Sequence, residues 1–199
     1  MKVYVIRHGE TVNNRENRWS GCYDTPLTEK GYEDARIVGA RLQGIPFDKV
    51  YASTLSRAVD TARTALPDYI PEQNALLKEL DVGNIENKPS NIITPEERER
   101  TRAEGYTAYG GESREEFRAR VREFMELLEQ RNDQTVAVFT HLGWLLAMLK
   151  EVLGVTIPAG RLSCGNCVTA VFEYTKETGW KLHSWLAPDQ APAKPKDVL

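Results

Sequence analysis

The 199-residue chain is poor in the features that mark membrane, secreted and nucleic-acid-binding proteins. Its longest apolar stretches fall far short of the roughly 20 residues that a membrane-spanning helix needs. It opens without the basic segment, apolar run and cleavage site of a signal peptide. Its formal charge of -3, with no run of like charges, offers no basic surface to nucleic acid or a membrane. We therefore expect a cytoplasmic protein without nucleic-acid or membrane partners.

Cysteine is also scarce, with three in the chain. Cys164 and Cys167 form a Cys-x-x-Cys pair, which fits either a redox pair or half of a zinc site. No second such pair and no histidine pair is present to complete four metal ligands. We prefer the simpler interpretation, in which the two residues flank a turn before a strand that begins near Val168. No metal or other cofactor is predicted.

What the chain does have is an alternation of strand-like and helical patterns. Short apolar runs predict strands at 2–6, 49–52, 135–140, 168–174 and 181–186. Apolar residues at helical spacing predict helices after Thr28, after Ser53, at 114–130 with Ser113 as the cap, and at 143–153. This alternation predicts an α/β fold, a three-layer α/β/α sandwich around a mostly parallel, doubly wound sheet. No helix separates the last two strands, which predicts an antiparallel edge.

The chain is long enough for one domain with a sizeable core, because 41% of its residues are hydrophobic. We place this domain at 1–187 and expect the tail at 188–199, rich in proline, alanine and lysine, to be disordered. Between 84 and 111 the periodicity weakens, and proline, glycine and charged residues are frequent. Irregular loops on a rigid scaffold often carry binding residues, so this stretch is the predicted lid or specificity segment.

Histidine follows two of the predicted strands. Arg7, His8 and Gly9 come directly after the strand at 2–6, and His141 comes directly after the strand at 135–140. Open α/β sheets bind ligands outside the carboxyl ends of their strands. A histidine beside an arginine and a glycine at that edge is therefore well placed to meet an anion.

Further motifs connect these two histidines to a known family. In chain order they are Arg7-His8-Gly9-Glu10-Thr11, Asn14, Pro26-Leu27-Thr28 with Gly31, Ser53 to Ala58 with Thr61-Ala62, Glu79 with Gly83, Gly111-Glu112-Ser113, and Thr140-His141. This ordered set resembles the histidine phosphatase superfamily, in the branch of the cofactor-dependent phosphoglycerate mutases and small phosphoesterases. The resemblance covers nearly the whole chain and implies a phosphoglycerate mutase-like fold.

The resemblance implies phosphoryl transfer through a phosphohistidine, with His8 as the nucleophile. A neutral imidazole can attack phosphorus, and neighbouring arginines lower its pKa by disfavouring the imidazolium. Arg7 and Arg57 match the family's phosphate clamps, since guanidinium groups offer planar, charged donors to phosphate oxygens. Arg57 also follows Ser53 closely enough for a helix N-terminus to add its amides to the anion site.

The resemblance assigns the remaining roles to residues on other elements. His141 would donate to the phosphoryl group opposite His8, and Asn14 would add a neutral donor. Glu79 matches the proton donor, and partial burial beside apolar neighbours would raise its pKa enough to keep it protonated. Ser20 and Gly21 are similar to the residues that hold phosphoglycerate in the mutases.

The chain departs from the family pattern in three places. Asn87 stands where a glycine is usual, Ile85 where an aromatic residue is common, and Leu142 where a glycine follows the second histidine. A bulkier Leu142 would narrow the pocket, while its backbone amide would still be able to bind phosphate. These departures bear on the choice of substrate rather than on the chemistry.

Three functions compete. A mutase must keep water from the phosphoenzyme, and the family's mutases do so with a longer insertion, a glutamate-arginine-histidine-tyrosine run and an arginine pair. Here Glu79 is followed by Leu80-Asp81-Val82, the segment before Gly111 is short, and no Arg-Arg pair occurs. We therefore predict a phosphatase that acts on a small phosphorylated metabolite, as a monomer or homodimer and without a metal. The alternatives are a bisphosphoglycerate-dependent phosphoglycerate mutase and a non-catalytic module that binds a phospho-ligand.

Overall fold

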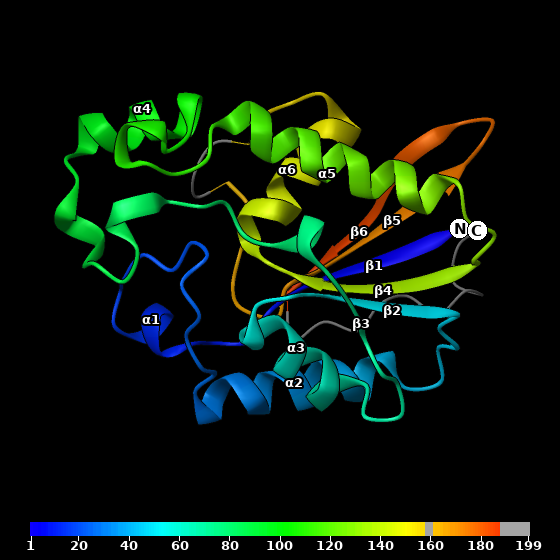
Figure 1. Ribbon diagram of the computed structural model, residues 1–199. Coiled ribbons are helices and arrows are strands. Elements are labelled where there is room, and N and C mark those ends of the chain that lie inside the picture. The colour runs from blue at the N-terminus through cyan, green and yellow to red at the C-terminus, as the bar shows by residue number, and fades with distance from the viewer. Residues whose placement is uncertain (158–160, 188–199) are drawn as a thin grey trace.

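The computed structural model describes residues 1–157 and 161–187 (Figure 1). Within them, strands form one sheet in the order β3-β2-β4-β1-β5-β6. Their bounds are Lys2–Arg7 (β1), Lys49–Ser53 (β2), Glu72–Asn74 (β3), Thr135–Thr140 (β4), Thr169–Thr175 (β5) and Gly179–Leu186 (β6). The first four strands pair in parallel, and β5 and β6 form an antiparallel edge. The predicted antiparallel edge is confirmed, whereas the short strand β3 was not predicted.

Helices cover both faces of this sheet. α5 (Arg114–Glu129) and α6 (Leu142–Leu153) lie on one face, and α2 (Glu29–Leu42) and α3 (Ser56–Ala65) lie on the other (Figure 1). Side chains of β1 alternate between the two layers, because successive residues of a strand point to opposite faces. Val3 and Val5 pack in the cluster that includes α5 and α6, and Tyr4 and Ile6 pack in the cluster under α2 and α3. The predicted three-layer sandwich is confirmed.

The N-termini of the helices test the predicted caps. Thr28 caps α2 and Ser113 caps α5, both as predicted. The prediction for α3 was less accurate, because Ser53 ends β2 and the helix begins only at Ser56. Leu55 precedes that helix without a side-chain cap, so the local sequence carried no clear start signal.

The segment at 84–111 is more regular than predicted. It contains the helix α4 (Pro95–Glu104), with the short turns η3 (Ser90–Ile92) before it and η4 (Thr107–Tyr109) after it. Thr94 and Glu97 form a capping box at its start, and Thr101 is its one buried residue. Because α4 buries so little, hydrophobic periodicity could not reveal it, and only the cap carried a signal.

The sheet register brings the predicted site residues to one edge. Arg7 lies opposite Thr140, and Ala52 lies opposite Phe139. The residues that end or follow these strands, His8, Ser53 and His141, therefore meet where the parallel strands end. The short helix α1 (Val12–Arg15) and the polar helix α4 lie beyond this edge of the sheet (Figure 1).

Further sequence predictions concern the turn before β5, membrane-spanning helices and the tail at 188–199. A turn precedes β5 as predicted, but Asn166 and Cys167 form it, so Cys167 lies in the turn and does not flank it. In the part of the chain that is described, no helix combines the length and apolar character that a membrane crossing requires. The predicted tail at 188–199 lies outside the described residues. The domain boundary at residue 187 stays a prediction.

Candidate active site

His8 is buried at the end of β1, with 4% of its surface exposed. Its Nδ1 atom lies 2.7 Å from the carbonyl oxygen of Gly9. A carbonyl can only accept a hydrogen bond, so Nδ1 must carry the proton and the lone pair is left on Nε2. The ring lies 5.2 Å from the ring of His141, measured between centroids. His8 is therefore held in the tautomer that a nucleophile at Nε2 requires.

The backbone around His8 is held from two other elements. The Gly9 amide donates to Thr61 Oγ1 of α3 at 2.9 Å. Asn166 Nδ2 lies 3.2 Å from the carbonyl oxygen of His8 and 3.1 Å from that of Gly9. Asn166 was not predicted, because an asparagine in a turn ordinarily serves the turn itself. Its contacts show that the turn before β5 supports the loop of His8.

Asn14 lies against the same loop. Its Oδ1 atom accepts from the Thr11 amide at 3.2 Å and from Asn166 Nδ2 at 3.0 Å. These two donors set the orientation of the Asn14 amide. They leave Nδ2 of Asn14 as the group that would donate to a ligand, and the predicted contact with phosphate stays a prediction.

Two arginines flank the histidines. Arg57 is fully buried at the start of α3, where its Nη1 and Nη2 atoms donate to the carbonyls of Tyr23 at 2.9 Å and Gly21 at 2.7 Å. Arg7 donates through Nη1 to the carbonyl of Cys164. These contacts leave the Nε atoms of both arginines buried without a hydrogen-bond partner among the described residues.

The loop at 20–21 contributes a hydroxyl and a carbonyl. Ser20 Oγ is buried without a partner in the described part of the chain. Gly21 has φ +52, and a Cβ atom there would lie 2.6 Å from Glu86 Oε1. The left-handed backbone at this glycine lets its carbonyl accept from Arg57. Gly21 thus helps to orient an arginine, and the substrate contact predicted for it stays a prediction.

The pKa values of the two histidines are lowered by the same surroundings. Burial, followed by the charges of Arg57 and Arg7, holds the pKa of His8 well below 6.5. Burial, followed by the charge of Arg57, does the same to the pKa of His141. Both rings are therefore neutral near neutral pH.

His141 is fully buried and stands directly before α6. Its Nε2 atom lies 2.8 Å from Ser53 Oγ, and its Nδ1 atom has no partner in the described residues. Leu142 is the first residue of α6. The first amides of a helix point along its axis without an intrahelical acceptor, so the backbone of Leu142 remains suited to an anion.

Glu79 lies next to the N-terminus of α6. Its Oε1 atom accepts from the Leu80 amide at 2.9 Å, and its Oε2 atom accepts from the Gly143 amide at 3.1 Å. A Cβ atom on Gly143 would lie 2.2 Å from Oε1, so any other residue there would displace this carboxylate from its position. Burial lowers the pKa of Arg7 and of Arg57, and the charge of Glu79 is the next cause and raises both. The structure thus brings Glu79 within electrostatic reach of the two arginines.

The segment that carries Glu79 is held by Arg120 of α5. Its Nη1 atom donates to the carbonyls of Leu76 at 3.0 Å and Lys78 at 2.6 Å, and Nη2 donates to the carbonyl of Glu79 at 2.9 Å. Glu112 binds the same guanidinium through two oxygens, at 2.8 and 2.9 Å. Arg120 was not predicted, because a single arginine on a helix gives no sign of the carbonyls that it will meet.

One departure from the family pattern has a structural explanation. Asn87 has φ +55, a left-handed conformation that favours glycine and that asparagine tolerates better than most residues. Its amide donates to the Trp19 carbonyl at 2.8 Å, next to Ser20. The aromatic side chain of Trp19 packs against Tyr106, which is 5% exposed. Asn87 therefore preserves the backbone of the loop where the family usually has glycine.

Buried polar side-chain atoms that lack a hydrogen-bond partner indicate the kind of ligand that this site binds. Six such atoms occur among the described residues; two are Trp19 Nε1 and Tyr109 Oη, and the other four belong to predicted site residues. These four are Arg7 Nε, Arg57 Nε, His141 Nδ1 and Ser20 Oγ. Buried polar groups in native proteins are almost always hydrogen-bonded. Donors from two guanidiniums, an imidazole and a hydroxyl suit an anion with several acceptor oxygens, such as phosphate. In the residues that are described, no group of three or more His, Cys, Asp and Glu side chains could hold a metal ion.

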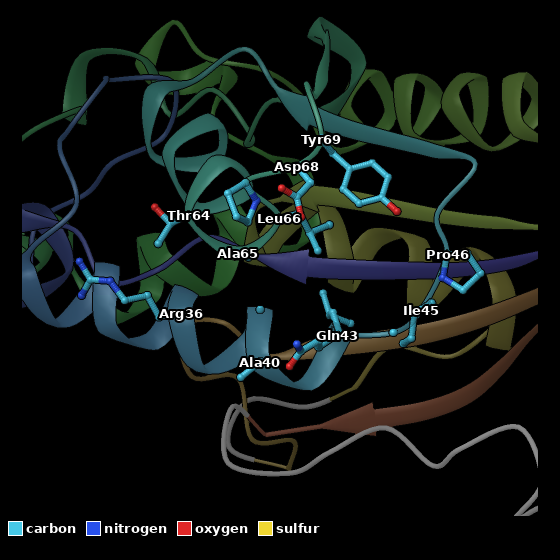
Figure 2. A pocket seen from close by; sticks show the side chains of 14 residues that line it. Arg36, Ala40, Gln43, Ile45, Pro46, Thr64, Ala65, Leu66, Asp68 and Tyr69 are labelled. Carbon is cyan, nitrogen blue, oxygen red and sulfur yellow. The ribbon is translucent and has the colours of Figure 1, made fainter.

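A separate hollow lies away from this site. It has a volume of about 590 Å³ and lies between the C-terminal parts of α2 and α3 (Figure 2). Its lining includes Arg36, Ala40, Gln43, Pro46 and Tyr69. Pro46 precedes β2, so the hollow is at the amino end of that strand, opposite the end that carries Ser53. None of the predicted site residues lines it.

Known proteins share this fold and much of the sequence. A family model described as the histidine phosphatase superfamily (branch 1) matches residues 3–187. The adenosylcobalamin/α-ribazole phosphatase of Salmonella typhimurium is 34% identical over 175 residues, which cover 81% of this chain and 83% of that protein. A candidate α-ribazole-5′-P phosphatase of Escherichia coli has a TM-score of 0.77 at 28% identity, covering 94% of this chain and 97% of that one. A phosphoglycerate mutase of Thermus thermophilus has a TM-score of 0.74 at 29% identity, covering 94% and 99%.

Proposed function

We propose that this chain, which belongs to the histidine phosphatase superfamily (branch 1), hydrolyses a small phosphate monoester through a phosphohistidine on His8. The observation that carries this proposal is the state of the His8 ring. Its Nδ1 proton is held by the Gly9 carbonyl, so that Nε2 keeps a lone pair near the charges of the buried Arg57 and the partly buried Arg7. A nucleophile next to cations that bind the transferred group is what phosphoryl transfer needs.

The reaction would proceed in two steps. In the first, His8 Nε2 attacks phosphorus, the P–O bond of the ester breaks, and the leaving alkoxide takes a proton from Glu79. Arg7, Arg57 and His141 bind the phosphoryl oxygens, where they stabilise the charge of the transition state. In the second step, Glu79 takes a proton from water, the water oxygen attacks the phosphohistidine, and phosphate leaves as the N–P bond breaks.

The chain is similar both to phosphatases and to a phosphoglycerate mutase. We favour the phosphatase, because the chain lacks the Arg-Arg pair and the longer insertion that shield the phosphoenzyme in mutases. One observation favours the mutase as a second candidate. Ser20 Oγ is buried without a partner among the described residues, and the matching serine holds phosphoglycerate in the mutases. A small phosphorylated metabolite would be the substrate in either case, and α-ribazole phosphate is one candidate that the relatives suggest.

A panel of esters tests this proposal. The purified protein is assayed with sugar phosphates, α-ribazole phosphate and phosphoglycerates, with His8→Ala as the control. We expect phosphate release from at least one ester, no release by His8→Ala, and unchanged activity in the presence of a chelator. Interconversion of phosphoglycerate isomers only after priming with the bisphosphate would establish the mutase instead. Tight vanadate binding without turnover of any ester would indicate a binding module.

Location and assembly are further expectations of the same proposal. We propose that the protein acts in the cytoplasm, where small phosphorylated metabolites are made and consumed. It is expected to be a monomer or homodimer, which light scattering on the purified protein would decide. Neither expectation affects the chemistry at His8.

A further inference from the structure

Ser53 and His141 form a hydrogen bond at the buried end of the sheet. Ser53 is the last residue of β2, His141 directly follows the neighbouring strand β4, and neither residue is exposed. The distance between Ser53 Oγ and His141 Nε2 is 2.8 Å. Because the bond lies in a dry environment, its direction fixes which ring nitrogen of His141 carries a proton.

A second contact indicates that direction. The Leu55 amide donates to Ser53 Oγ at 3.3 Å, so this oxygen already accepts one hydrogen bond. If Nε2 also donated to it, the hydroxyl proton would be left without any acceptor that the described residues place within reach. If the hydroxyl donates to Nε2, all three groups are satisfied. The arrangement therefore runs from the Leu55 amide to the Ser53 hydroxyl and on to Nε2.

We propose that Ser53 is a positioning residue that holds His141 with its proton on Nδ1. The proton on Nδ1 then makes His141 a hydrogen-bond donor to a phosphoryl oxygen. The two histidines are set to opposite tasks by their partners, because the Gly9 carbonyl leaves His8 a free lone pair and the Ser53 hydroxyl leaves His141 a free N–H. The catalytic meaning of this difference rests on the proposed function, but the tautomer of His141 does not.

Two further observations agree with this assignment. His141 Nδ1 is buried and has no partner in the described part of the chain, which suits a donor kept for a ligand. Burial and the charge of Arg57 hold the pKa of His141 well below 6.5, so the ring is neutral at neutral pH. In a neutral ring only one nitrogen carries a proton, and the partner of the other nitrogen decides which one.

Nitrogen NMR of the wild-type protein tests the tautomer directly. The chain has three histidines, and ¹⁵N labelling of their rings separates protonated from lone-pair nitrogens. His183→Gln and His141→Gln assign the signals. We expect His141 to show a protonated Nδ1 and a lone pair on Nε2. A proton on Nε2 would overturn the proposal, whether or not the protein hydrolyses any ester.

Substitution of Ser53 then tests its effect on the anion site. Ser53→Ala is expected to shift His141 toward the Nε2–H tautomer and to weaken vanadate binding by about 10-fold. Ser53→Thr keeps the hydroxyl and should restore both readouts. Thr169→Val, which removes another buried hydroxyl, is the matched control and should change neither. Unaltered tautomer and vanadate affinity in Ser53→Ala would contradict the positioning role.

The proposed phosphatase function and the positioning role of Ser53 can be refuted independently of each other. A wild-type protein that is inactive on every ester but shows the expected tautomer would refute the proposed function alone. An active phosphatase with the opposite tautomer would refute the role of Ser53 alone. If Ser53→Ala does not fold, the wild-type spectrum and Ser53→Thr still decide the matter.

Discussion

The two sides of the candidate active site are built differently. His8 and His141 follow neighbouring parallel strands, are almost completely buried, and are held by main-chain and side-chain groups of the sheet and α3. Glu79 is half-buried on an irregular segment, and its position depends on Arg120 of α5 and on the amide of Gly143 in α6. The side with His8 and His141, here called the phosphate side, is therefore part of the scaffold. The side with Glu79, here called the acid side, is tied to the scaffold by a few contacts.

This difference suggests a division of labour. A phosphoryl group is the same in every substrate, so a rigid site at the strand ends serves all of them. The leaving group differs between esters, and the residue that protonates it stands on the segment that leads into α4 and the turns around it. Substitutions on the acid side should therefore change activity in a way that depends on the leaving group, and those on the phosphate side should not.

The largest effect that separates the two sides is expected for Glu79→Gln. The amide cannot supply the proton, so kcat on an alkyl phosphate should fall about 10²–10⁴-fold. An aryl phosphate with a good leaving group needs little protonation and should lose much less in its first step. Rapid-quench measurement of phosphoenzyme formation on both esters checks this. Equal losses on the two esters would contradict the role of Glu79 as the acid.

Gly143→Ala should move the carboxylate without removing it. The new Cβ would lie 2.2 Å from Glu79 Oε1, so the side chain must shift, and a misplacement of this kind costs about 10²-fold. Steady-state kinetics on alkyl and aryl esters would show whether the loss follows the leaving group. Gly165→Ala is the matched control, because a Cβ there meets nothing within 4 Å. Full activity of Gly143→Ala would show that the Glu79 contact is dispensable.

Arg120→Met should loosen the acid segment and weaken the fold. The guanidinium and its partner Glu112 are mostly buried, with side-chain exposures of 17% and 16%, so breaking the pair should cost about 2 kcal/mol of unfolding free energy. The loss of kcat on alkyl esters should be about 10-fold, again larger than on aryl esters.

Arg122→Met on the same helix is the control for Arg120→Met. Arg122 pairs with Glu115, whose side chain is 74% exposed, and more loosely, at 3.6 Å, with Glu151. Glu151 keeps its shorter pair with Arg118 at 2.6 Å, so the removal of Arg122 should cost under about 1 kcal/mol. Urea denaturation measures both variants. If Arg120→Met lowers stability but leaves the ratio of alkyl to aryl rates unchanged, Arg120 supports the fold without positioning Glu79.

The smallest expected effect is on pH dependence and belongs to the phosphate side. Burial, then Arg57 and Arg7, holds the pKa of His8 well below 6.5, so kcat/KM should not decline as pH falls through 6.5. The unfolded chain binds protons at its histidines first, so the unfolding free energy should decrease as pH falls from about 6.5 toward the lowered pKa. Rate profiles and urea titrations over this range check both. A decline of kcat/KM centred at 6.5 would contradict the neutral, buried His8.

The same contrast explains what could be predicted from the sequence. The family and the three-layer fold were predicted and are confirmed, because strand-length apolar runs and ordered motifs depend on local sequence. His8 and His141 could be placed at one edge for the same reason. The roles of these residues stay predictions that the experiments above test.

The acid side could not be predicted to the same depth. Arg120 acts through main-chain carbonyls that come close only in the folded chain, and no residue type signals such contacts. Asn166, on the side of His8, was missed for the same reason. The polar helix α4 lacks an apolar stripe, so its segment was wrongly predicted as irregular. Gly143 had a weak signal, since a glycine near a helix start often allows close approach of another group.

The most direct test of the account is to trap the phosphoenzyme. The protein is mixed with a phosphate ester that it hydrolyses, quenched in alkali, which preserves phosphohistidine, and digested for mass spectrometry. We expect one phosphate on His8, carried on Nε2, in the wild-type protein and in Glu79→Gln with an aryl ester. Phosphate on another residue, or hydrolysis that persists in His8→Ala, would contradict it.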